Sequence, residues 1–174
     1  GAVHDAAYKA SESLVAIGGN EVLEELIQLL KHENLETRFL AAVTLGELED
    51  NEAALQPVLD AIQDKENLSI AGDLIPTLED YDLSSKYVEL FKHYLFGSFK
   101  VSMQAQDLLD HKEFDITARV IKKSRKHWDH YSNNVKHDEL YDLKKLEVEE
   151  MLGHLQEYVD SQAKEGEQVI PTED

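Results

Sequence analysis

Apolar residues recur along most of this chain at spacings of three and four positions, which places them on one face of an α-helix. The pattern predicts helices over about 3–17, 21–32, 35–49, 52–64, 67–80, 84–96, 98–110 and 115–132. No stretch sustains the alternation of apolar and polar residues that a half-buried strand needs. We therefore predict an all-α protein.

The helical pattern itself repeats along the chain. Segment 10–21 aligns with segment 41–52 at an offset of 31, and the Glu-Asn-Leu tripeptide at 33–35 recurs at 66–68. A fourth, weaker copy passes through Val101, Ala105 and Leu109. We place four helix pairs at about 2–32, 34–64, 67–96 and 98–132, which together form one array over 2–132. Because one helix pair cannot bury both of its apolar stripes, such pairs must stack on one another.

Glycine, asparagine and proline mark the ends and bends of these helices. Gly18 and Gly19 stand where a left-handed residue ends the first helix. Asn20 and Asn51 are expected to cap the helices that follow them. Gly72 and Pro76 fall inside the predicted helix 67–80 and should bend it.

The second repeat resembles a known family. Segment 38–48 reads Arg-Phe-Leu-Ala-Ala-Val-Thr-Leu-Gly-Glu-Leu, and segment 51–59 reads Asn-Glu-Ala-Ala-Leu-Gln-Pro-Val-Leu. Both resemble the short HEAT repeats named after phycobilisome lyases, and the resemblance covers about the first 95 residues. It implies a right-handed α–α superhelix of the HEAT/armadillo type, a solenoid of about four helix pairs whose second helices line the concave side. It specifies an architecture and no particular activity.

Residues 138–162 follow the repeats and form one long predicted helix with an apolar stripe. We expect this helix to cap the last repeat, as the end of a solenoid requires. The alternative is a helix–helix surface for a homodimer. Residues 163–174 are polar, and we expect a disordered tail there.

Composition narrows the classes of function. The chain has 36 acidic residues against 17 Lys and Arg, a formal net charge of −19, which opposes binding to nucleic acid or to an anionic membrane. Cysteine is absent, which excludes disulfides, thiolate catalysis and cysteine zinc sites. The longest apolar runs are too short to cross a bilayer. We expect a cytoplasmic protein, and Gly1 in the place of an initiator Met suggests an excerpt of a longer one.

Catalytic and metal-binding patterns are weak. Deoxyhypusine hydroxylase is built from similar helix pairs and holds iron with several His-Glu dipeptides, whereas only His32-Glu33 occurs here. The pair His127 and His130 lies one helical turn apart, but two imidazoles alone make an incomplete metal site. We therefore expect no catalytic residue, no metal and no cofactor. The alternative is a lyase or hydrolase framed by the solenoid.

A basic stretch interrupts the acidic chain. Residues 116–137 contain six Lys and Arg and a single acid, Asp129. On the predicted helix, one side carries the residues Arg119, Lys122, Lys123 and Lys126, with Trp128 near its boundary. A basic face beside an aromatic ring can grip acidic side chains or phosphates. Three interpretations stay open: a solvated face that offsets acidic neighbours, a surface for an acidic partner, and a nucleic-acid contact.

The outward positions of the second helices change in charge along the array. They run in order through Glu21, Glu24, Glu25, Gln28, Glu52, Gln56, Asp60, Gln63, Lys86, Glu89, Lys92 and His93 to the basic stretch. A groove graded from acidic to basic would select a partner of opposite gradient. The plain alternative is a set of ordinary solvated helix faces. We predict a non-catalytic scaffold that binds a protein or peptide in this groove, with an enzyme or a structural oligomerisation module as alternatives.

Overall fold

The computed structural model describes residues 2–168, and every regular element within them is helical. The elements are α1 (Ala2–Ile17), α2 (Gly19–Leu29), α3 (Leu35–Glu47), α4 (Glu52–Gln63), the 3₁₀ helix η1 (Lys65–Asn67), α5 (Ala71–Leu74), the 3₁₀ helix η2 (Ile75–Leu78), α6 (Tyr87–Phe96), α7 (Phe99–His111), α8 (Ala118–Asn134) and α9 (Glu139–Gln168). The prediction of an all-α solenoid is confirmed.

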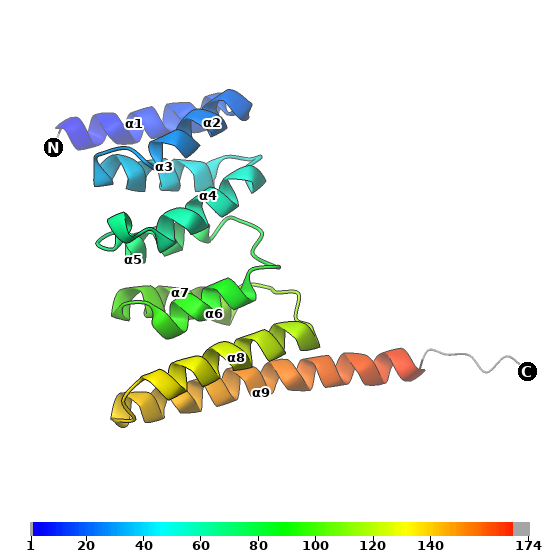
Figure 1. The fold of residues 1–174 in the computed structure, drawn as a ribbon. Helices are drawn as coiled ribbons and strands as arrows, with labels where there is room; N and C mark the ends of the chain where they lie inside the picture. The colour runs from blue at the N-terminus through cyan, green and yellow to red at the C-terminus, as the bar shows by residue number, and fades with distance from the viewer. Residues whose placement is uncertain (1, 169–174) are drawn as a thin grey trace, which may run out of the picture.

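The helices stack as an open pile, from α1 and α2 at the top of Figure 1 to α8 and α9 at the bottom. Helices α1, α3, α5 with η2, and α7 pack in succession, and we call them the first row. Helices α2, α4, α6 and α8 form the second row, in which α2 packs on α4 and α6 packs on α8. Cross-contacts between α2 and α3, α4 and α5, and α6 and α7 tie the rows together.

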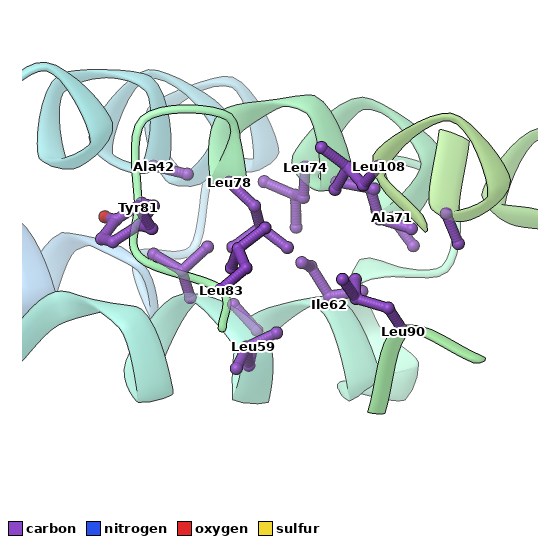
Figure 2. Packing of buried hydrophobic residues seen from close by; sticks show 14 of the residues in the cluster. Ala42, Leu59, Ile62, Ala71, Leu74, Leu78, Tyr81, Leu83, Leu90 and Leu108 are labelled. Atoms are coloured by element: carbon purple, nitrogen blue, oxygen red, sulfur yellow. The ribbon is translucent and has the colours of Figure 1, made fainter. Parts of the chain in front are cut away.

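One continuous core runs between the rows (Figure 2). Leu59 of α4, Leu74 of α5, Leu78 of η2 and Leu90 of α6 are completely shielded from solvent. Leu59 belongs to the second helix pair and the other three to the third, so the core continues from one pair into the next. Burial of apolar surface contributes about 25 cal/mol per Å² removed from water. In this protein, that surface becomes buried only when the helix pairs stack.

The third helix pair departs from the prediction of one helix over 67–80. The chain instead forms η1, α5 and η2 in succession. Pro76 lies in η2 and has no amide N–H to continue an α-helical ladder. Leu68, which falls between η1 and α5, consequently lies 73% exposed.

The helix ends confirm one expectation and correct others. Gly18 and Gly19 have φ of 60° and 85°, the left-handed region expected there. Because α2 already begins at Gly19, Asn20 lies inside the helix and is not its cap. Asn51 does precede α4, but its side chain makes no capping hydrogen bond to α4 and donates to the Gly46 carbonyl in the last turn of α3 at 3.1 Å. Asn34 supplies a cap that was not expected, accepting from the Thr37 amide at 3.1 Å.

Polar side chains link neighbouring helix pairs at the repeat spacing. Ser11 and Thr44 are 33 residues apart, and their hydroxyl oxygens lie 2.6 Å from each other in the buried interface. The buried Arg38 donates to the Asn67 side-chain oxygen at 2.7 Å and to Glu66 at 3.3 Å. Asn67 in turn donates to the Ala61 carbonyl at 2.9 Å. These contacts satisfy buried groups and fix how one pair sits on the next.

Helix α9 packs against α8 through the buried side chains of Tyr141, Val148 and Leu152. Its other side exposes Leu140, Leu143 and Leu146. The helix continues to Gln168, beyond the expected end at 162, so residues 163–168 are helical rather than part of a disordered tail. The rest of that expected tail, 169–174, lies outside the described residues. Self-association through α9 stays a prediction.

Replacing Asn67 by Ala tests the link between the second and third pairs. The change removes one partner of Arg38 and the shorter of two hydrogen bonds to the Ala61 carbonyl, which keeps only the Asp64 amide at 3.3 Å. We expect a loss of about 1–3 kcal/mol in the free energy of unfolding, measured by urea denaturation. The exposed Asn133→Ala is the control, with an expected change within about 0.5 kcal/mol. Equal effects of the two changes would contradict a structural role for Asn67.

Candidate functional site

Three surface grooves border helices of the second row. The first lies between α2 and α4 and has a volume of about 330 Å³; its lining includes Lys31, Asp60 and Asp64. The second, also about 330 Å³, lies between α4 and α6. The third, about 720 Å³, runs along α8 and reaches Gln156 of α9. The exposed side of the second row therefore offers a succession of recesses.

Three of the predicted site residues form one hydrogen-bonded chain across α4 and α6. Gln56 donates to Asp60 at 2.9 Å and accepts from the Lys86 ammonium at 3.0 Å. Lys86 also lies 3.6 Å from a carboxylate oxygen of Glu89. Residues from two helix pairs thus act together, and a partner that rests on α4 would also contact the start of α6.

The α4–α6 groove combines apolar and titratable side chains. Phe96, 48% exposed, and Leu68 contribute apolar surface, while Lys92 and His93 add polar groups. Oε2 of Glu89 and Nε2 of His93 are shielded from solvent and have no hydrogen-bond partner among the described residues. Burial lowers the pKa of His93, and the nearby Lys92 charge lowers it further. The groove therefore favours a neutral imidazole beside a carboxylate.

The α8–α9 groove gathers the predicted basic residues. Its lining includes Arg119, Lys122, Lys123 and Lys126, together with Arg125. All five side chains are exposed, whereas Ile121 and Ser124 of the same helix are buried against the array. The amphipathic pattern of α8 thus turns its cations outward, as the sequence predicted.

Trp128 does not join these cations. It is half-buried and stacks between Tyr131 and Tyr141, with ring centroids 5.7 and 5.8 Å away. At 100° per residue, Trp128 lies on the side of α8 opposite to Lys126. The ring therefore belongs to the packing of α8 on α9, and the geometry offers no stacking surface at this residue for a ligand of the basic face.

The remaining predicted residues occupy the far end of the second row. Glu21, Glu24, Glu25 and Gln28 are all exposed on α2, and none of them lines the α2–α4 groove. The structure therefore places them on an open helix face above the groove. Their negative charge faces the solvent at the end opposite to the cations of α8 (Figure 1).

The described residues contain neither a candidate metal-binding cluster nor a candidate membrane-spanning helix. Within residues 2–168, no three or more His, Asp and Glu side chains gather in a way that could hold a metal ion. None of the helices in that part combines the length and apolarity that crossing a bilayer requires.

Comparison with protein families gives one match. Residues 4–78, which cover α1 to η2, match a family model of HEAT repeats. Over these residues the chain is HEAT-like. Comparison with curated proteins and with solved structures found no match. HEAT repeats commonly mediate protein–protein interaction. The finer resemblance to the phycobilisome-lyase type is not confirmed.

Several groove residues of this HEAT-like array escaped the sequence analysis as site candidates. Leu68 and Phe96 were expected in helical apolar stripes, and only the break of the third repeat exposes Leu68. Glu89 and His93 were predicted among the outward groove residues, and their spacing of four on one helix face could also have flagged them as a pair. Arg125 belonged to the predicted basic stretch, and the structure adds it to the groove.

The contrasting environments of Trp128 and Lys126 predict opposite effects of mutation. Trp128→Ala should lower the free energy of unfolding by at least about 2 kcal/mol, because it removes a ring packed between two tyrosines. Lys126→Ala should change it by less than about 0.5 kcal/mol, since the side chain is exposed and makes no ion pair. Chemical denaturation of both variants measures this, and similar effects would contradict the assigned orientation of α8.

Two histidines should titrate in opposite directions from the ordinary pKa of about 6.5. The pKa of His93 is lowered by burial, so protonation costs stability as the pH falls through 6.5. The pKa of His111 is raised by its hydrogen bond to Glu79, then by that to the Asp107 carbonyl. Its stabilising contribution is complete below 6.5 and is lost as the pH rises through the folded-state pKa. Imidazole NMR titrations, assigned with His93→Gln and His111→Gln, check this; coincident midpoints would refute it.

Proposed function

We propose that this HEAT-like array is a non-catalytic scaffold that binds a partner protein or peptide along its second row. The observation that carries the proposal is the succession of grooves along α2, α4, α6 and α8. A polypeptide that follows this row would contact several recesses in turn, and many modest contacts would add up to one specific interaction. The resemblance to HEAT solenoids, whose second helices line the concave side, agrees with this choice.

The distribution of charge supports a directional interaction. Helix α2 presents Glu21, Glu24 and Glu25, while α8 presents only cations on its groove side apart from Asp129. Between them, the hydrogen-bonded series runs from the acidic Asp60 through the neutral Gln56 to the basic Lys86. A partner with the opposite order of charges would bind in one direction only, because the reversed orientation places like charges together.

Binding without chemistry is part of this proposal. The charged groups of α2 and α8 lie on open helix faces, whereas catalysis gains most where groups are preorganised and water is excluded. The proposed location is the cytoplasm, which agrees with a chain that contains no cysteine to oxidise.

Site-specific photocrosslinking tests which row contacts the partner. A benzophenone side chain would replace Gln28 of α2, Gln63 of α4 or Lys92 of α6, all exposed second-row positions. Exposed first-row positions Glu12 of α1 and Asp107 of α7 serve as controls. After irradiation in cells that express the natural protein, we expect one common adduct from the second-row positions and none from the controls. Adducts confined to the first row would refute the proposed surface.

A further inference from the structure

The groove between α8 and α9 carries the densest positive charge of the described chain. Five cations lie between Arg119 and Lys126, a stretch of about 10 Å at 1.5 Å per residue. The groove they line has a volume of about 720 Å³ and includes one acid, Asp129. Helices α8 and α9 pack side by side, as Figure 1 shows, and the groove is an open recess along α8 that reaches Gln156 of α9.

None of these five cations has an ion-pair or hydrogen-bond partner among the described side chains, residues 5–166. Elsewhere in the protein, cations do form ion pairs with carboxylates: Arg38 with Glu66, Lys86 with Glu89 and Lys100 with Asp73. One interpretation of the basic stretch was a solvated face whose charge is offset by acidic neighbours. The ion pairs with carboxylates that would support this interpretation are missing. Although the chain has 36 acidic residues, none of those described forms an ion pair with the cations of α8.

The cluster repels itself. Lys122 and Lys126 are four positions apart, and Arg119 and Lys122 are three apart, so like charges face each other on the same helix side. They also occupy the first half of α8, where the positive end of the helix dipole disfavours cations and no acidic residue stands in the first turn. An anionic ligand in the groove would relieve both sources of repulsion.

The geometry distinguishes among anionic ligands. A nucleic acid would cover this 10 Å stretch with about three phosphates per strand, and its remaining phosphates would meet a chain of net charge −19. An anionic membrane extends far beyond this recess, and its remaining headgroups would meet the same acidic chain. A short acidic segment can place all of its carboxylates within the groove, and arginine holds a carboxylate by two parallel hydrogen bonds.

We propose that the α8–α9 groove docks a short acidic segment of a partner protein, with three or more Asp or Glu within about two helical turns. This inference rests on the proposed function and identifies the class of segment that its basic end recognises. The carboxylates would lie opposite Arg119, Lys122 and Lys126, which repeat at the spacing of one helix face.

A labelled synthetic peptide provides the test. The probe is a fluorescent 14-residue Ala/Gln peptide with Glu at positions 3, 6, 7 and 10, and its control has Gln at those positions. Fluorescence anisotropy with the full chain at about 50 mM salt should show binding of the Glu peptide only, which weakens as salt increases. The double variant Lys122→Gln/Lys126→Gln should bind about tenfold more weakly, because two exposed charge contacts are lost.

A matched double variant separates a specific site from general attraction. Lys65→Gln/Lys136→Gln also removes two exposed cations but leaves the groove intact, and we expect less than about a twofold change. Absence of binding by the wild-type chain, or equal weakening by the two double variants, would overturn the proposal. If a 16-base-pair DNA duplex or phosphatidylserine vesicles bound more tightly than the Glu peptide, the assignment of the groove to a polypeptide would be overturned.

The outcome is independent of the crosslinking experiment. If the peptide fails to bind while Gln28, Gln63 and Lys92 still crosslink to a common partner, the scaffold function stands and the acidic-segment site falls. If the peptide binds specifically while those positions give no adduct, the groove stands as a local site and the scaffold along the whole second row falls.

Discussion

Burial of apolar surface between successive helix pairs is the constraint on which this structure depends. Leu59, Leu74, Leu78 and Leu90 come from four separate elements and are shielded only by one another and their neighbours. No pair can keep its apolar stripe from water alone, so the array has to grow by stacking. The helix faces that do not pack against an adjacent pair can then carry either charge without disturbing the core. In this protein, that freedom appears as an acidic α2 and a basic α8 in the same row.

The stacked interfaces also enclose polar groups, and several of these pair across neighbouring repeats. Ser11 meets Thr44 one repeat later, and Arg38 meets Asn67 of the next repeat. A slip of one pair against the next would separate these partners and leave buried polar atoms unsatisfied, which costs more than the pairing itself contributes. The polar contacts therefore define the register of the stack, while the apolar contacts supply most of the driving force. A defined register is what holds the grooves of the second row at set positions.

The proposed function rests on a contrast between the buried interfaces of the helix pairs and the exposed face of α8. Arg38 and Asn67, in the interface between the second and third pairs, have hydrogen-bond partners, whereas the five cations of α8 have none among the described side chains. Unpaired, self-repelling charge on a helix that packs well on its other side is compatible with stability because α8 contributes Ile121 and Trp128 to the packing. The same helix can thus serve the fold through one side and a partner through the other.

The sequence by itself determined the local features: the helical periodicity, the 31–33 residue repeat, the left-handed Gly18–Gly19 turn and the basic stretch of α8. Each depends on residues close together in the chain, where spacing alone decides which side chains share a face. Only the tertiary structure decided that residues 67–78 break into short helices, that Gln56 joins Lys86, that Trp128 turns inward, and that the cations of α8 lack partners. These features depend on distances between elements far apart in sequence, and such distances exist only once the helix pairs have stacked.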